Sequence, residues 1–309
     1  MHIIKQLSED FIVSEVTNVK LIDSGKYIYF WLEKLNLSTL ESIQLIARKL
    51  NSNPKFFGFA GNKDKKAVTK QLCSVKNVKK DNLEKLNLNN IKITFAGFGN
   101  KPISLGDLKG NDFEIIVRNI DKTPKINNKF VNLFGKQRFS TKNVDIGRAI
   151  IKRDFKKAIE LINDDKIAEF LKYNTNNFTS ALKLVPIKLL MLYVHSYQSF
   201  FWNKLAEKYK DSKENMLLPI IGFGTEITKD VKRLLEEENI STRDFIVKEI
   251  PELSIEGSER DLFAEAHDLE LGDLESDELN SEKKKIKLKF FLPKGCYATE
   301  FIRQNFESS

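Results

Sequence analysis

The sequence predicts an α+β protein with a mixed β-sheet. In the first 140 residues, short runs of alternating apolar and polar residues are typical of half-buried strands. From about residue 143 the apolar spacing becomes helical, and after residue 283 it alternates again. Because strands and helices are intermixed without a regular strand–helix–strand rhythm, the pattern favours α+β over a doubly wound sheet.

The elements of the first part follow from local patterns. Residues 38–50, "STLESIQLIARKL", offer a capping box from Ser38 to Glu41 followed by apolar residues at helical spacing, which predicts one amphipathic helix. Five further segments are predicted to be strands: "DFIVSEVTNV", "KYIYFWLEKL", "AVTKQLCSVKNV", "NIKITFAGF" and "NDFEIIVRNI".

The middle of the chain is predicted to be rich in helix. Helical patterns run through "NVDIGRAIIKRDFKKAIELIN", "KLLMLYVHSYQSFFWNKLAEKYK" and "ITKDVKRLLEEENI", with a strand-like "MLLPIIGFGTE" before the last. The final stretch, "KKKIKLKFFLPKGCYATEFIRQNF", alternates at Ile286, Leu288 and Phe290, so we expect the end of the chain to return to sheet. A helical block between sheet-forming parts suggests an insertion, which we place at residues 154–256, between 1–153 and 257–309.

Length and composition limit the class of protein. A chain of 309 residues with 41% apolar and 30% charged residues suits a soluble globular protein, and we expect two domains. No apolar run approaches the roughly 20 residues of a membrane helix, and the N-terminus lacks the long apolar region of a secretory signal. We therefore expect a cytoplasmic protein that does not enter a membrane.

The charge is basic and unevenly spread. The net charge is +8, although residues 261–282 hold nine acids and no lysine or arginine. Outside that segment, basic residues exceed acidic ones by 17. Such a surplus favours polyanionic partners, of which nucleic acid is the commonest.

The cysteines and histidines do not predict a metal site. Cys73 and Cys296 lie far apart, without a second cysteine or a histidine at ligand spacing, and we expect both to be buried thiols. His195 lies in the aromatic run "YVHSYQSFFWN", whose spacing is typical of a buried helical stripe. An RNA-contacting role for Tyr197 or Gln198 in this run is the alternative.

Two stretches could carry chemistry. In "FFGFAGNKDKKAVTKQL", Asp64 lies among Lys63, Lys65 and Lys66, and local chemistry alone indicates a solvated turn. In "NLFGKQRFS", rings and a guanidinium group occur with amides, a combination that can stack on unpaired RNA bases and hydrogen-bond to their edges. The alternative is that the rings are core and the polar groups are surface. The candidates in this stretch are Asn132, Phe134, Gln137 and Arg138.

Taken together, six stretches between residues 9 and 304 resemble the signature blocks of the TruD family of tRNA pseudouridine synthases, most closely its archaeal branch. They are "EDFIVSE", "FAGNKDKKAVTKQ", "LGDLKGNDF", "NLFGKQRF", "SYQSFFWN" and "LPKGCYATEFIRQ". Asn62 stands where many members have threonine or glutamine, which leaves Asp64 in register. The resemblance implies a pseudouridine synthase fold in residues 1–153 and 257–309, interrupted by the family's helix-rich α/β insertion domain at 154–256.

The resemblance also implies a reaction and its residues. The family converts a uridine of tRNA, uridine 13 in the D arm, to pseudouridine, and the reaction needs no cofactor or metal. Asp64 is the implied nucleophile, Lys5 its ion-pair partner and Phe134 the ring that packs on the extruded base. Asn132 is expected to hydrogen-bond the uracil edge or fix the loop. The remaining residues expected at the substrate site are Lys63, Gln137, Arg138 and Glu15.

Two other classes of function stay open from the sequence. A non-catalytic RNA-binding protein or tRNA chaperone could keep the same fold, but binding alone has no need of an acid facing phosphates. A carboxylate-pair hydrolase acting on nucleosides would need a second acid, for which Glu15 is the candidate. We expect tRNA as the partner and no obligatory protein partner.

Overall fold

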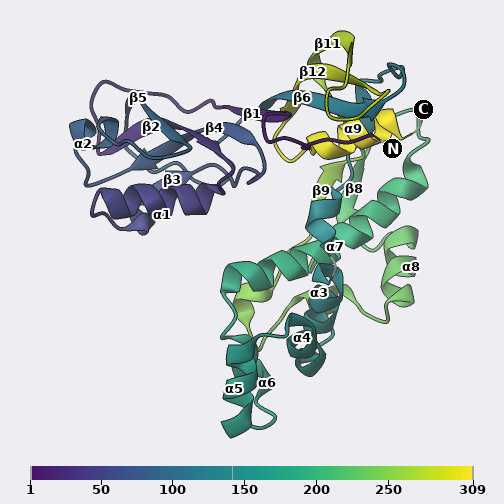
Figure 1. Cartoon of the computed structure of the whole chain (residues 1–309). Coiled ribbons are helices and arrows are strands. Elements are labelled where there is room, and N and C mark those ends of the chain that lie inside the picture. The colour runs from purple at the N-terminus through teal and green to yellow at the C-terminus, as the bar shows by residue number, and fades with distance from the viewer. Residues whose placement is uncertain (1, 141, 308–309) are drawn as a thin grey trace. The chain divides into compact units, whose positions relative to one another are not determined.

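The computed structural model describes residues 2–140 and 142–307. These residues form two compact units (Figure 1). Unit 1 combines two parts of the chain, Met1–Asn128 and Glu265–Ser309, and unit 2 is the single stretch Lys129–Ala264. The expected insertion, residues 154–256, lies within unit 2, and its bounds as a domain stay a prediction.

Unit 1 is built on one mixed sheet with the strand order β11-β12-β6-β1-β4-β2-β5, and β3 pairs with β4 beside it. β1 and β4 run parallel, with Ile12 opposite Val68, whereas the other paired strands of the sheet are antiparallel. The predicted α+β fold with a mixed sheet is confirmed. The strands are β1 (Phe11–Val16), β2 (Tyr27–Leu35), β3 (Phe57–Phe59), β4 (Val68–Val75), β5 (Ile91–Gly99), β6 (Gly110–Ile120), β11 (His267–Ser276) and β12 (Lys284–Pro293).

Helix α1 (Thr39–Lys49) lies against one face of the strands β2 to β5 (Figure 1). It begins at the predicted capping box, in which the Ser38 hydroxyl accepts from the Glu41 amide and the Glu41 carboxylate accepts from the Ser38 amide. Ile43 and Ile46 on its inner side are buried with Phe30 of β2. Burial of this apolar face, at roughly 25 cal/mol per Å², holds the helix on the sheet.

The last part of the chain differs from the prediction. The alternation at 286–290 belongs to β12, which ends at Pro293, and the chain then turns at Gly295 (φ +86°) into helix α9 (Ala298–Phe306). Phe301 of α9 packs on Phe290 of β12, with ring centroids 4.6 Å apart. The prediction of sheet to the end of the chain was therefore wrong, because "ATEFIRQNF" buries residues at helical spacing.

The acidic segment contributes strands to the fold. Most of it forms β11, an edge strand of the sheet of unit 1 with largely exposed side chains. Lys285 of β12 pairs with Glu278 at 2.6 Å and Glu275 at 3.7 Å. Charged side chains on an edge strand hinder pairing with another chain, which gives this acidity a structural explanation.

Unit 2 is rich in helix, as predicted, with short strands at its borders. Its longest helix, α7, buries Tyr197, Phe201, Trp202 and Leu205, and β8 pairs antiparallel with β9. The elements are β7 (Lys129–Val131), α3 (Asn143–Ile151), α4 (Phe155–Ile162), α5 (Asp165–Tyr173), α6 (Phe178–Leu182), α7 (Ile187–Tyr209), β8 (Leu217–Ile220), α8 (Lys229–Glu237), β9 (Ser258–Asp261) and β10 (Phe263–Glu265).

The predicted helical stretch 143–163 is two helices with a break between them. Arg153 has a left-handed backbone (φ +62°), and the Asp154 side chain caps α4 by accepting from the Lys157 amide. The Arg153 guanidinium donates to the Ile246 carbonyl and forms an ion pair with Glu249 at 3.1 Å. These contacts from a distant segment fix the break, which local periodicity does not reveal.

Candidate active site

Asp64 lies in the loop that joins β3 to β4. Its Oδ2 atom is 3.0 Å from Nζ of Lys5, and the side chain is 29% exposed. Among the described residues, no hydrogen bond reaches Oδ1. One carboxylate oxygen is therefore held by a cation, while the other is available to an incoming group.

Lys5 is held in an unusual conformation. Its φ of +58° lies in the left-handed region, which costs a non-glycine residue about 1 to 3 kcal/mol. Its ammonium group lies 3.9 Å from the centroid of the Phe11 ring and bonds to Asp64. Both contacts stabilise this position of the side chain and offset the backbone strain.

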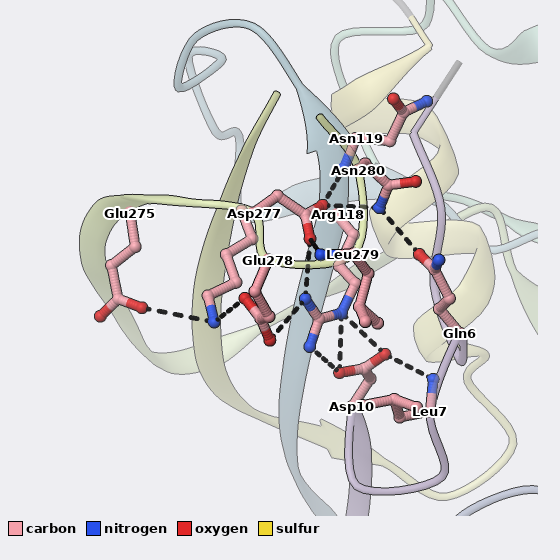
Figure 2. Close-up of polar contacts among 11 residues, drawn as sticks. Gln6, Leu7, Asp10, Arg118, Asn119, Glu275, Asp277, Glu278, Leu279 and Asn280 are labelled. Atoms are coloured by element: carbon pink, nitrogen blue, oxygen red, sulfur yellow. Dashed lines mark hydrogen bonds and ion pairs between the residues drawn. The ribbon is translucent and has the colours of Figure 1, made fainter. Parts of the chain in front are cut away.

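A buried polar network fixes the chain just after Lys5 (Figure 2). The Arg118 guanidinium of β6 donates to Asp10 through Nε and Nη2, at 2.9 to 3.0 Å, and to Asp277 through Nη1 at 2.9 Å. Asp10 also accepts from the Leu7 amide at 2.7 Å. The network thus joins the N-terminal segment, β6 and the turn between β11 and β12.

Hydrogen bonds decide the charge of Asp277 in this network. Burial alone would raise the pKa of Asp277, but donors that include the Asn119 amide, the Asn280 side chain and Arg118 lower it to about 2. Asn280 donates to Gln6 at 2.9 Å as well, as the dashed lines of Figure 2 show. Asp277 therefore remains charged at neutral pH, and the guanidinium of Arg118 lies between it and Asp10.

The lysines of the Asp64 loop contact other acids. Lys63 lies 2.8 Å from Oε2 of Glu15 in a buried ion pair and donates to Oδ1 of Asn111 at 2.6 Å. Lys65 pairs with Glu41 of α1 at 2.7 Å on the surface. Among the residues described, none of the loop lysines forms an ion pair with the neighbouring Asp64, which is contacted instead by Lys5 and Lys34 from outside the loop.

Lys34 is the residue of this site that sequence reasoning missed. Its Nζ donates to the carbonyl oxygen of Asp64 at 2.9 Å. The signal was present in "YIYFWLEKL", because Phe30, Leu32 and Lys34 fall on one face of the strand and the first two are core residues. A lysine at a core position of a strand indicates a specific partner.

Other side chains hold the loop backbone. Oγ1 of Thr39 accepts from the Lys63 amide at 3.0 Å and donates to Oε1 of Gln71 at 2.8 Å. The Gln71 amide group donates in turn to the Gly61 carbonyl at 3.0 Å. These bonds tie the loop to α1 and β4, so the Asp64 carboxylate is presented from a fixed backbone.

The candidates of the stretch 132–138 form a second cluster, in unit 2. Phe134 is 8% exposed, and its ring lies edge-on to Trp202 with centroids 5.6 Å apart. The Arg260 guanidinium carbon is 4.4 Å from the Phe134 centroid, and Arg260 also donates to the side chain and carbonyl of Asn132. Trp202 and Arg260 come from distant parts of the sequence, which is why local patterns did not reveal them.

The other two candidates of this stretch differ in exposure. Arg138 donates to the Ser199 hydroxyl at 3.3 Å and lies 5.6 Å from the Phe134 centroid, whereas Gln137 is exposed. The structure therefore brings Asn132, Phe134 and Arg138 together within unit 2. It brings Lys5, Glu15, Lys63 and Asp64 together within unit 1.

The remaining sequence candidates are mostly structural. Tyr197 and Gln198 are buried, which favours packing over the RNA-contacting alternative. His195 lies 3.0 Å from Gln198. Cys73 is buried as expected, but Cys296 is partly exposed, so the expectation of two buried thiols was wrong for Cys296.

Metal ligands and membrane helices were also sought. Within residues 2–140 and 142–307, no three histidine, cysteine or acidic side chains gather as a metal site would require. In the same residues, no helix is sufficiently long and apolar to cross a bilayer.

Comparison with known proteins defines the class. A crystal structure from Methanosarcina mazei, described as a TruD protein, matches with a TM-score of 0.72 and 25% identity, over 98% of this chain and 93% of the other. The fold is that of a pseudouridine synthase, an isomerase. The family model of tRNA pseudouridine synthase D (TruD) matches residues 2–168 and 204–305. The chain belongs to the TruD family, as its signature blocks predicted.

Curated relatives agree over nearly the full length. The Aquifex aeolicus tRNA pseudouridine synthase D is 25% identical over 98% of this chain and 97% of its own. A Nanoarchaeum equitans protein named a probable tRNA pseudouridine synthase D is 28% identical, with 98% of both chains covered. A Methanosarcina acetivorans protein with the same name is 28% identical over 97% of this chain and 91% of its own.

Proposed function

We propose that this chain converts a uridine of tRNA, uridine 13 in the D arm, to pseudouridine with Asp64 as the nucleophile. Family membership supports the reaction class and tRNA as the substrate. The choice of uridine 13 rests on the family resemblance. The proposal for the nucleophile rests on the Asp64 carboxylate itself.

The observation that carries the nucleophile assignment is the unequal environment of the two carboxylate oxygens. Lys5 holds Oδ2 at 3.0 Å, whereas Oδ1 accepts no hydrogen bond from the residues described and the side chain is partly open. A nearby cation favours the ionised carboxylate, which is the nucleophilic form. A carboxylate that served only a turn would have no need of this pairing.

The reaction requires no change in oxidation state. The Asp64 carboxylate adds to ribose C1′ or to uracil C6, and the C1′–N1 bond breaks. The freed base rotates, C5 bonds to C1′, and the bond to Asp64 breaks to restore the carboxylate. The proton on C5 then leaves to an acceptor and N1 gains one, so that substrate and product are isomers.

The surrounding residues support this chemistry in different ways. Glu15 neutralises Lys63 in the interior, which leaves Lys5 as the cation of the Asp64 carboxylate. Before attack the uridine must leave its stack, which costs a few kcal/mol. We propose that Phe134 packs on the extruded base, that Asn132 binds the uracil edge or fixes its loop, and that Arg138 holds the motif or a phosphate. We assign Gln137 to the same RNA-binding stretch.

The decisive experiment is Asp64→Asn. Asparagine keeps the shape of the side chain but lacks the charge and most of the nucleophilicity, so tritium release from tRNA labelled at uridine C5 should fall to background. The affinity for tRNA should be equal to or above that of the wild type, because a carboxylate facing phosphates has been neutralised. Asp81→Asn in α2 (Lys80–Glu84), an exposed aspartate of unit 1, is the matched control and should release tritium normally.

Two outcomes would contradict the proposal. Normal turnover by folded Asp64→Asn would remove Asp64 as the nucleophile. If the wild type binds tRNA but releases no tritium from any uridine, the alternative of a non-catalytic RNA-binding protein or tRNA chaperone would take its place.

A further inference from the structure

Lys34 is a lysine in the core of unit 1 that the reaction scheme leaves unused. It is 2% exposed and shares its face of β2 with Phe30 and Leu32, which are fully buried. Transfer of an ammonium group from water to such a site is costly unless its donors are satisfied. Its partners should therefore reveal its role.

Both partners of Lys34 are backbone carbonyls close to the nucleophile. Nζ donates to the Leu37 oxygen at 2.5 Å and to the Asp64 oxygen at 2.9 Å. Within the described part of the chain, no carboxylate forms an ion pair with this ammonium group. Lys34 thus holds the backbone carbonyl of Asp64, while Lys5 holds one oxygen of the Asp64 carboxylate.

We propose that Lys34 is a positioning residue for Asp64. Its ammonium group holds the Asp64 carbonyl oxygen, so that the carboxylate keeps its contact with Lys5, and it adds a second positive charge close to Asp64. This inference rests on the proposed function of Asp64. An ammonium group suits the role because its three donors can serve two carbonyls at once. The positioning is charge-assisted, and so it depends on the protonation of Lys34.

Burial and charged groups from several elements shift the pKa of Lys34. Burial lowers its pKa to about 8, against the opposing charges of Asp64 from the loop and Glu41 from α1. Lys63 in the loop lowers the pKa further, and the Cys73 thiol faces it from β4. As the pH rises through 8, Lys34 becomes neutral, and the positive charge next to the Asp64 carbonyl is lost. Turnover should fall with it.

The first test measures the coupling of the two charges without catalysis. In protein labelled with ¹³C-lysine, the Lys34 side-chain resonance, assigned through bonds, should titrate near pH 8. In Asp64→Asn the midpoint should move to lower pH, because the carboxylate that favours the ammonium form is gone. Asp81→Asn should leave it unchanged. A midpoint that is the same in all three proteins, or one near the ordinary 10.5, would overturn the inference.

The second test measures turnover against pH. We expect wild-type kcat to fall above pH 8, and kcat of Lys34→Gln at pH 7 to be lower by on the order of 10- to 100-fold, as for other displaced catalytic groups. The KM for tRNA should stay the same, and the alkaline fall should be absent from the variant. Lys92→Gln, which removes an exposed lysine of β5, should behave as the wild type.

The outcomes separate the two proposals. If the wild type is active but Lys34→Gln keeps its kcat and pH profile, positioning by Lys34 is wrong while the synthase function stands. If the wild type shows no turnover at any pH, the proposed function fails, and the resonance midpoints alone decide whether Lys34 and Asp64 are coupled. Should Lys34→Gln fail to fold, the same resonance experiment decides, because it needs no substitution of Lys34.

Discussion

In the Asp64 loop, an acid and the lysines next to it in the sequence do not form ion pairs with one another. Lys63 and Lys65 flank the aspartate, yet their ammonium groups pair with Glu15 and Glu41. The cation at the carboxylate comes instead from Lys5, 59 residues away in the sequence. Because the flanking lysines pair with other acids, neither covers the Asp64 carboxylate, which stays partly exposed.

The buried pair of Glu15 and Lys63 should be important for stability. Glu15→Gln leaves the Lys63 ammonium group in the interior without its counter-charge, which typically costs 3 to 5 kcal/mol. Urea unfolding should report a loss of about this size. Glu114→Gln, which breaks the more exposed pair with Lys287 at 2.8 Å in the same sheet, should cost less than about 1 kcal/mol. Equal losses in the two variants would contradict a special role for the buried pair.

As the pH rises and Lys34 loses its proton, turnover should fall whereas the stability of the folded chain should rise. Its pKa is about 8 in the folded chain and 10.5 ordinarily, so the folded state disfavours the charged form. This penalty, about 3 kcal/mol, is fully present below pH 8 and disappears as the pH rises to 10.5. The unfolding free energy of Lys34→Gln relative to the wild type should therefore decline by about that amount between pH 8 and 10.5.

Urea unfolding of the two proteins at several pH values measures this difference. Lys92→Gln, at an exposed position, should show no such decline relative to the wild type. A constant difference between Lys34→Gln and the wild type would mean that Lys34 titrates alike in the folded and unfolded chain.

The candidate site could be predicted where its residues lie in family blocks, and not where it depends on tertiary contacts. Asp64 lies in one of these blocks, and Lys5 was proposed from the family resemblance as its ion-pair partner. Lys34 was overlooked because a lysine in an alternating strand is expected to be exposed unless its own face of the strand is known to be core. Trp202 and Arg260 reach Phe134 from 68 and 126 positions away, and no local pattern encodes such contacts.

At the scale of elements, α3 and α7 approach closely at a glycine. A Cβ atom built on Gly147 would lie 2.1 Å from the Tyr193 carbonyl oxygen and 3.1 Å from Cβ of Tyr197. The contact is with helix backbone, which cannot move as a side-chain end can. The glycine is thus required by packing, despite its poor helix propensity.

Gly147→Ala should therefore destabilise unit 2. Separating two packed helices to admit one methyl group typically costs 1 to 3 kcal/mol, more than the gain in helix propensity. Thermal unfolding should show the loss. Gly61→Ala is a suitable control for the added methyl group, because no atom lies within 4 Å of the Cβ built there. If Gly147→Ala were as stable as the wild type, the helices would have to be able to separate freely.

The elements themselves were predictable where a local signal starts or ends them. Helix α1 has its capping box in the sequence, and the strands of unit 1 have their alternation. The break at Arg153 was missed because it depends on Ile246 and Glu249, about 90 residues further on. The strand β11 was missed because an exposed edge strand of acids lacks an apolar face.

At the scale of the whole molecule, the basic surplus should govern tRNA binding. The chain carries a net charge of +8 with nine acids concentrated in residues 261–282. If about 6 to 10 phosphates are neutralised, affinity should fall by about 10³ to 10⁵ between 50 and 200 mM salt. Filter binding at several salt concentrations gives the slope, which Asp64→Asn should share. An affinity that did not respond to salt would argue against a phosphate-rich partner.

The divided unit 1 also has a consequence for synthesis on the ribosome. Unit 2 is one continuous stretch, Lys129–Ala264, so the contacts within it do not depend on residues that follow it in the chain. The sheet of unit 1 must wait, because β6 pairs with β12 and Arg118 with Asp277, both of which follow unit 2 in the chain. Until then a nascent chain exposes an unpaired strand edge and a guanidinium group without its second carboxylate. Completion of the sheet therefore follows the synthesis of unit 2, and a chain cut short before β12 would lack the strand that pairs with β6.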